Sequence, residues 1–129
     1  MRLLSLSAAA LILSATASAA EFRISFAWGD IPACNSGRPN VVASPRFVIA
    51  DLPDGTTSVR FRLKDLDAPN YNHGGGTVGM SGSGVLPAGV FTYKSPCPPG
   101  GVHTYEWTAT ARKGNKTLGT AKARRTYPE

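Results

Sequence analysis

The sequence predicts an all-β protein, and the simplest architecture for its length is a small antiparallel β-sandwich. Apolar and polar residues alternate in several segments, which is the period of a half-buried strand. Fourteen glycines and ten prolines interrupt the 129 residues, and both residue types favour turns. Helical periodicity is almost absent after residue 20. Short strands separated by turn signals are typical of a sandwich.

Residues 1–20 are predicted to be a secretory signal peptide. Arg2 precedes an apolar run, and small residues close the segment, so that cleavage fits after Ala19 or Ala20. The apolar run, roughly 12–14 residues, is too short for a good membrane span, so no transmembrane span is expected. The remaining residues, 21–129, suit a single domain in the periplasm or outside the cell. An N-terminal anchor or a buried helix is the alternative.

The first half of the predicted domain contains two strands and the segments that join them. Residues 22–28 alternate apolar with polar side chains, and residues 47–49 form a short apolar run. Residues 29–45 are rich in Pro, Gly, Asn and Ser, which predicts a loop. Residues 51–55 predict a turn because Pro and Asp-Gly supply the dihedral angles that it needs.

The next strand leads into the first candidate site residues. Residues 59–64 place apolar side chains at odd positions and basic side chains at even positions, so the odd positions face the core. If the strand continues, Asp65 and Asp67 also point inward. A buried ionised carboxylate is costly without partners. Hydrogen-bond donors, a histidine, a metal or a ligand are therefore expected beside them.

A later strand brings a second set of candidates. Residues 103–112 place His103 and Tyr105 on one face with Trp107, a predicted core residue. An antiparallel neighbour would set the end of one strand beside the start of the other. Asp65 and Asp67 would then meet His103 and Tyr105 at one rim of the sandwich.

The C-terminal part predicts a hairpin with a basic return strand. Residues 113–115 read as a turn, and residues 117–126 return as a strand of small and basic residues. Without Arg2 the chain has 13 basic and 8 acidic residues, a net charge of +5. This bias favours anionic lipid or polymer surfaces, but the charges are spread along the chain, as on an ordinary solvated surface. No aromatic platform accompanies them, so no nucleic-acid partner is expected.

Cys34 and Cys97 are the two cysteines of the chain. Because an exported protein meets an oxidising compartment, a disulfide between them is expected. It would close a loop of roughly 60 residues and stabilise the fold by about 4 kcal/mol in the chain-entropy model. Two free buried thiols are the alternative.

Five segments occur in an order that resembles the phosphatidylethanolamine-binding protein family, in particular its bacterial Raf-kinase-inhibitor-like branch. They are SPRF at 44–47, DLPDGTTS at 51–58, DLDAP at 65–69, His73, and PCPPGGVHTYEW at 96–107. The resemblance covers about half of the chain. It implies a β-sandwich with Greek-key connections.

The resemblance also implies a small pocket for anions such as phosphate-bearing head groups. Its members, carried over by position, are Asp65, His73, His103 and Tyr105, with Asp67 as the second acid and Pro69 and Pro98 as walls. The sequence departs from the family pattern at three positions. Leu66 replaces a proline, Gly74 replaces a tryptophan and Thr104 replaces an arginine. These changes alter the shape and charge of the pocket.

The residue chemistry is consistent with such a pocket. A carboxylate beside imidazoles favours the protonated rings, whose N–H groups bind phosphate by charge-assisted hydrogen bonds. Tyr105 adds a hydroxyl donor, and glycines 74–76 let backbone approach a ligand.

The function expected is that of an exported, non-catalytic binding module that takes a small anionic ligand or lipid head group and needs no cofactor. One alternative is an interaction or enzyme-inhibitor domain with a protein partner and a vestigial pocket. Another is a metal site or hydrolase that uses Asp65, Asp67, His73 and His103. The sequence lacks HExxH-like spacing and a GxSxG nucleophile motif.

Overall fold

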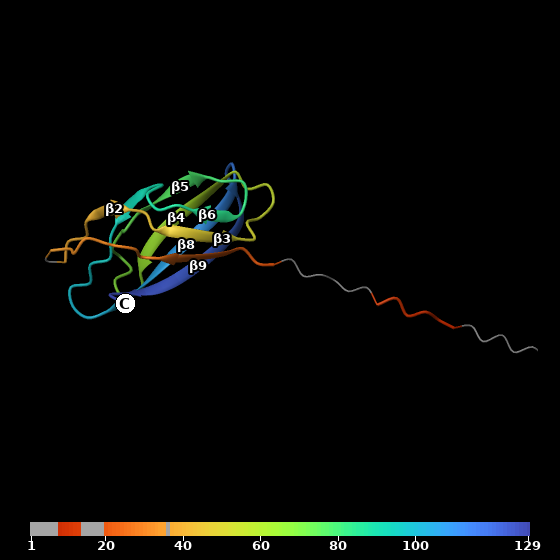
Figure 1. The fold of residues 1–129 in the computed structure, drawn as a ribbon, viewed down its shortest axis with the longest axis horizontal. Coiled ribbons are helices and arrows are strands. Elements are labelled where there is room, and N and C mark those ends of the chain that lie inside the picture. Colours follow the sequence, from red (N-terminus) through yellow and green to blue (C-terminus); the bar gives the residue numbers. More distant parts are fainter. Residues whose placement is uncertain (1–7, 14–19, 36) are drawn as a thin grey trace, which may run out of the picture.

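The computed structural model describes residues 8–13, 20–35 and 37–129, and these residues form nine strands and no helix (Figure 1). The all-β class predicted from the sequence is therefore confirmed. The strands are β1 (Arg23–Ala27), β2 (Val41–Ala43), β3 (Arg46–Ala50), β4 (Ser58–Asp65), β5 (Gly75–Gly79), β6 (Gly84–Leu86), β7 (Thr92–Lys94), β8 (His103–Lys113) and β9 (Lys116–Tyr127).

The strands form two main layers and a small ribbon. One sheet has the order β5-β4-β8-β9, the second has the order β1-β3-β6, and β2 pairs with β7. Every pairing between these strands is antiparallel. In Figure 1 the three-stranded sheet lies in front of the four-stranded sheet. Each of the two main sheets is completed by a pairing between strands that are distant in the sequence, β3 with β6 in one and β4 with β8 in the other.

The core between the layers is rich in aromatic rings. Phe47 of the three-stranded sheet lies 4.6 Å, between ring centroids, from Phe61 of the four-stranded sheet. Trp107 meets Phe47 edge-on at 5.4 Å, and all three side chains are fully buried. Large rings at facing positions bury much apolar area and hold the layers together. The alternation expected for residues 22–28, 59–64 and 103–112 is the pattern that supplies them.

The register of β4 against β8 places the candidate site at one end of the sandwich. Leu63 pairs with Trp107, and Asp65, the last residue of β4, pairs with Tyr105. His103 is the first residue of β8 and lies beyond this pair. The antiparallel pairing expected between these two strands is therefore present, and it brings the Asp65 carboxylate and the His103 imidazole to the same rim.

Glycines 75 and 76 serve packing between strands, which corrects their expected role beside a ligand. A Cβ atom on Gly76 would lie 2.5 Å from Cβ of Phe91. Gly75, with φ +154°, lies so close to β4 that a Cβ would collide with the carbonyl group of Phe61. These glycines let β5 approach β4 and the Phe91 ring. Strands β5, β6 and β7, and β2 within the predicted loop 29–45, were not predicted, because they are short and poor in large apolar residues.

The predicted signal peptide lies largely outside the described residues. Of residues 1–20, only 8–13 and 20 are described, and they are exposed and form neither helix nor strand. The described ranges contain no helix long and apolar enough to cross a membrane.

Candidate functional site

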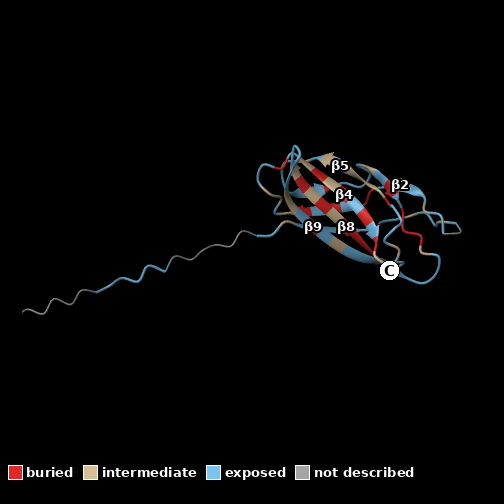
Figure 2. Ribbon diagram, turned by 180° about the vertical axis from the view of Figure 1, so that it is seen from behind, coloured by how far each residue is buried: buried red, intermediate tan, exposed pale blue. Residues whose placement is uncertain are grey.

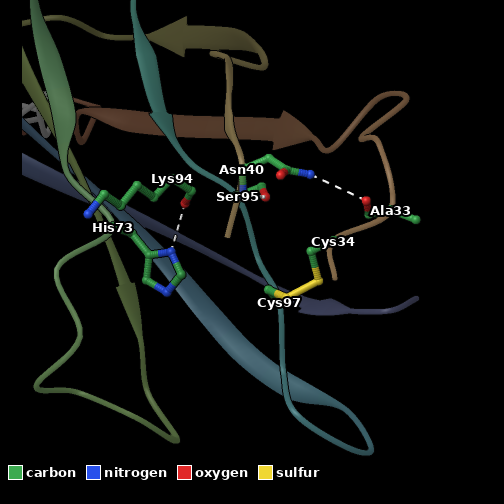
Figure 3. Close-up of a disulfide and its surroundings, with 7 residues drawn as sticks. All are labelled: Ala33, Cys34, Asn40, His73, Lys94, Ser95 and Cys97. Carbon is green, nitrogen blue, oxygen red and sulfur yellow. Dashed lines mark hydrogen bonds between the residues drawn. A yellow bond between two sulfur atoms is a disulfide. The ribbon is translucent and has the colours of Figure 1, made fainter. Parts of the chain in front are cut away.

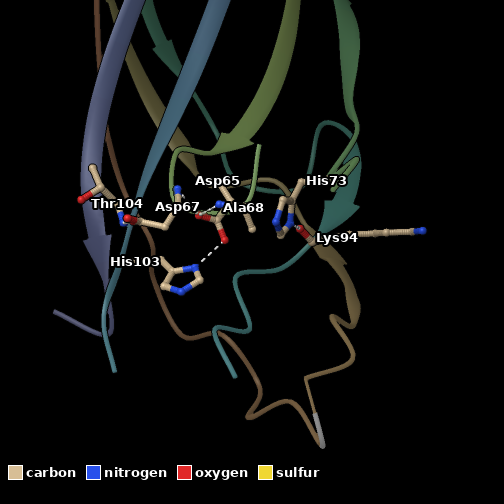
Figure 4. A network of polar contacts seen from close by, with 7 residues as sticks. All are labelled: Asp65, Asp67, Ala68, His73, Lys94, His103 and Thr104. Carbon is tan, nitrogen blue, oxygen red and sulfur yellow. Dashed lines mark hydrogen bonds and ion pairs between the residues drawn. The ribbon is translucent and has the colours of Figure 1, made fainter. Parts of the chain in front are cut away.

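A cavity of about 120 Å³ opens at the end of the sandwich where β4 ends and β8 begins. Its walls come from β4, β8, the loop after β4 and the two loops that a disulfide joins. The lining residues are Gly37, Pro39, Asp65, Ala68, Tyr71, His73, Cys97, Pro99, His103 and Tyr105. Four predicted site residues, Asp65, His73, His103 and Tyr105, are thus brought together around one hollow. Figure 4 shows three of them, Asp65, His73 and His103.

Asp65 is the centre of the hydrogen-bond network, and it is buried, with 4% of its surface exposed. Its Oδ1 accepts the backbone N–H groups of Asp67 at 2.9 Å and Ala68 at 3.1 Å. Its Oδ2 accepts Nδ1–H of His103 at 2.7 Å. Burial alone would raise the pKa of this carboxyl, but the hydrogen bonds from His103 and the turn outweigh it and lower the pKa. Asp65 is therefore ionised and fixes the orientation of the His103 ring.

Asp67 lies outside the core, which corrects the expectation that both acids point inward. The strand ends at Asp65, so the alternation of faces does not continue to Asp67, and this residue is exposed. Its Oδ2 accepts the backbone N–H of Thr104 at 2.7 Å. Asp67 therefore joins the turn after β4 to the start of β8, and it does not line the cavity.

His73 faces the cavity from the opposite side and is almost fully buried. Its Nδ1 lies 2.7 Å from the backbone carbonyl oxygen of Lys94, so Nδ1 carries the proton (Figure 3). Burial lowers the pKa of His73, although the Lys94 carbonyl and the Asp65 charge act in the other direction. The ring is therefore neutral near pH 7 and keeps a lone pair on Nε2. The expectation that neighbouring acids keep both rings protonated fails for His73, because desolvation is the larger effect.

Tyr105 forms the floor between the two histidines. Its ring meets His73 edge-on at 5.6 Å and lies 6.3 Å from His103, between centroids. Its hydroxyl is buried and has no hydrogen-bond partner among the described residues. Burial raises the pKa of Tyr105, and the nearby Asp65 charge adds to the effect, so the hydroxyl keeps its proton. A buried hydroxyl without a partner is costly, and here it lies at a cavity wall.

The predicted disulfide between Cys34 and Cys97 is present (Figure 3). It joins the loop before β2 to the segment after β7, two regions 63 residues apart in the sequence. Cys97 itself lines the cavity, as do Gly37 and Pro99 near the two ends of the bridge. The bridge therefore fixes one wall of the cavity to the other.

No protein-family model and no curated protein matches this sequence. Solved structures do match the fold, among them the two that follow. A phosphatidylethanolamine-binding protein homologue of Chlamydia trachomatis, CT736, aligns with a TM-score of 0.61 and 19% identity over 84% of this chain and 98% of its own. YbcL of Escherichia coli, described as a new member of the mammalian family, aligns with a TM-score of 0.60 and 18% identity over the same shares. The chain has the phosphatidylethanolamine-binding protein fold. The resemblance predicted from the sequence motifs is confirmed at the level of the fold.

Within this phosphatidylethanolamine-binding protein fold, the prolines predicted as walls are replaced by others. Pro69 is exposed, and neither Pro69 nor Pro98 lines the cavity. Pro39 and Pro99 take that place. Pro99 directly follows the predicted residue, so the motif located the wall to within one position. Pro39 lies in the loop that the disulfide anchors, and no feature of the sequence marked it as a cavity residue.

Tyr71 and Ala68 are lining residues that the sequence analysis missed. The Tyr71 ring packs edge-on against His73 at 4.6 Å between centroids. The Nζ atom of Lys94 lies 5.7 Å from the centre of the same ring. Tyr71 could have been suspected from the sequence because it is an aromatic residue two positions before the candidate His73, in a segment without regular secondary structure.

One group of potential metal ligands occurs in the described part of the chain. Single ligand atoms of Asp65, Asp67 and His103 lie within 4.8 Å of one another. Both oxygens of Asp65, Oδ2 of Asp67 and Nδ1 of His103 already take part in hydrogen bonds. His73, the fourth predicted ligand, lies outside the group.

Proposed function

We propose that this protein is an exported, non-catalytic binding module whose cavity takes a small oxyanion, the phosphate of a head group being the best-fitting case. The observation that carries the proposal is the buried Tyr105 hydroxyl, which lies at the cavity between two histidines and close to the Asp65 carboxylate but makes no hydrogen bond of normal geometry within the described part of the chain. A ligand oxygen would satisfy it. The name of the phosphatidylethanolamine-binding protein homologues that share this fold agrees with a ligand that carries a phosphate head group.

The hydrogen-bonding groups fit an oxyanion that brings one proton. Tyr105 donates its O–H, and the Nε2 lone pair of neutral His73 accepts a proton from a P–OH group. Nδ1–H of His103 is held by Asp65, so Nε2 is the ring atom that remains for a ligand.

The size of the cavity sets the kind of ligand. About 120 Å³ admits a small anion or several waters, whereas pockets for drug-sized ligands are roughly 300–1,000 Å³. A phosphate fits within the hollow, and any chain attached to it must leave through the open rim. The disulfide supports an oxidising compartment outside the cytoplasm.

The test is a titration of the folded, oxidised protein with inorganic phosphate and with phosphorylethanolamine, followed by NMR of the imidazole rings. The chain has only two histidines, so each ring can be assigned by replacing the other. Saturable shifts at both rings are expected. If neither ring responds to either compound, the proposal fails and the fold is left as an interaction or inhibitor domain. Elemental analysis of protein purified without chelator tests the metal alternative. A stoichiometric transition metal would contradict the proposal of an anion site and support a metal site.

A matched pair of variants separates the site from general effects of buried hydroxyls. Tyr105→Phe removes the hydroxyl at the cavity, and Tyr93→Phe removes another buried, unpartnered hydroxyl that does not line it. Tyr105→Phe should weaken phosphate binding by about tenfold, the value of a hydrogen bond to a charged group. Tyr93→Phe should leave it unchanged. Equal effects of the two variants would contradict the assigned site.

A further inference from the structure

The basic side chains of the chain gather on the outer face of the four-stranded sheet, although the sequence disperses them. Even-numbered residues of β4 and β8, and the β9 residues paired with those of β8, point away from the core. The charged residues of this face, here called the basic face, are Arg60, Arg62, Lys64, Glu106, Arg112, Lys122 and Arg124. It carries six cations and one carboxylate. The other charged residues after residue 20 are seven cations and seven acids, so the entire net charge of +5 lies here.

Five of the six cations form two rows, one on either side of β8. One row runs along β4, and the other, Lys122 and Arg124, runs along β9. β8 lies between these strands, so the rows are about 10 Å apart, with steps of about 7 Å along each strand. The floor between the rows is formed by β8 and carries the hydroxyls of Thr108 and Thr110 at its centre, with Glu106 towards one end and Arg112 towards the other. Beyond the first row, β5 presents glycines and a threonine to this face and leaves the row open.

Figure 2 shows this side of the sheet, where buried bands alternate with exposed or intermediate ones along β4 and with intermediate ones along β8. Arg62, Lys64, Lys122 and Arg124 are exposed. Glu106 is buried between the β9 cations, with Oε2 2.7 Å from Nε of Arg124 and Oε1 3.8 Å from Nζ of Lys122. The one carboxylate of the basic face therefore fixes the second row in place and leaves the first row unpaired within the described strands.

We propose that the basic face binds a linear acidic polysaccharide, a chain of sugars with sulfate or carboxylate groups, laid along β8 between the two rows. The rows supply cations to both edges of such a chain, and the threonine floor supplies hydroxyls that donate to and accept from sugar hydroxyls. This site is separate from the cavity and does not depend on the function proposed for it.

The shape and composition of the face favour this partner over two others. The ordinary twist of a β-sheet accumulates along strands of 11 and 12 residues, so a flexible chain follows the rows better than a planar bilayer does. The face has no exposed apolar side chain that would insert between lipids. It also has no aromatic side chain on which the bases of a single-stranded nucleic acid would stack.

The experiment measures binding of the full, oxidised protein to a heparin oligosaccharide by calorimetry. One variant combines Arg62→Gln, Lys64→Gln and Lys122→Gln, all exposed on the basic face. The matched control combines three exposed arginines elsewhere, at positions 23, 38 and 46, each changed to glutamine. Both variants lose three positive charges. The first should bind at least about tenfold more weakly and the control within about twofold of the parent, and affinity should fall steeply with added salt.

Each outcome decides the matter. Equal losses in the two triple variants would show attraction by net charge alone and would overturn the site. Equal or tighter binding to duplex DNA, or to phosphatidylglycerol vesicles, would overturn the class of partner. Glu106→Gln tests the same surface through an expected gain in affinity. Glutamine can still accept the hydrogen bond from Arg124, while the basic face loses its one negative charge. It should bind the oligosaccharide a few times more tightly, and a loss of affinity in a folded Glu106→Gln protein would contradict the proposal.

Discussion

Replacement of Asp65 by asparagine is expected to destabilise the protein in a pH-dependent way. The carboxylate is 4% exposed and accepts three hydrogen bonds, from His103 and from two backbone N–H groups of the following turn. Asparagine can keep one oxygen on the turn, but its amide nitrogen then faces the donor Nδ1–H of His103. The loss of one charge-assisted hydrogen bond, with the partly buried His103 donor left unpaired, costs about 2–3 kcal/mol. For a domain of this size the melting temperature falls by roughly 10 °C.

The pH dependence follows from the direction of the pKa shift. Because folding lowers the pKa of Asp65, its ionised form stabilises the folded protein fully above the unfolded pKa of about 3.9. That contribution disappears as the pH falls through the folded pKa. Chemical unfolding at pH 7 and at pH values below about 4, with the disulfide intact, should therefore show a large difference between parent and Asp65→Asn that narrows in acid.

Asp67→Asn is the matched control for this experiment. Asp67 is two residues away and exposed, and it accepts one hydrogen bond from the Thr104 backbone. Its replacement should cost less than about 1 kcal/mol. The reasoning is refuted if Asp65→Asn is as stable as the parent at pH 7, if its deficit is the same in acid, or if Asp67→Asn costs as much.

Three further predictions concern other parts of the structure. Gly76→Ala should lower the free energy of unfolding in urea by about 1–3 kcal/mol, because the new methyl group meets the packed Phe91 ring. Gly79→Ala on the same strand has open space at its Cβ, so it should cost no more than a substitution at an ordinary surface position. Equal costs for the two variants would contradict this account of the packing. Cys34→Ser combined with Cys97→Ser should lower the free energy of unfolding by about 4 kcal/mol, and an unchanged urea midpoint would refute the constraint assigned to the bridge. Burial lowers the pKa of His73, so the unfolded chain binds more protons there and the parent should lose stability as the pH falls below about 6.5. His73→Gln should lack this component, and identical pH profiles would contradict it.

Several parts of the fold were predictable because they follow from local alternation. The faces of β4 and β8 are set by the period of two, which placed Phe61 and Trp107 in the core and Asp65 on the same side. The motifs predicted the phosphatidylethanolamine-binding protein fold because they combine turn residues and strand ends in a fixed order. The end of β4 was less predictable. Whether the alternation continued to Asp67 depended on hydrogen bonds to Asp65 that form only when the turn folds.

The all-β class, the core faces of the long strands and the expectation of a disulfide between the two cysteines all follow from the amino-acid sequence. These properties depend on side-chain period and on composition. The tertiary structure alone decided that His73 is neutral, since its burial comes from loops distant in the sequence. The gathering of dispersed cations on one surface also depends on the tertiary structure. Antiparallel pairing places even-numbered residues of β4 beside even-numbered residues of β8, and these residues of β8 beside their partners on β9. Charge and burial at a point in space depend on which strands meet there, and that information is not local to any segment.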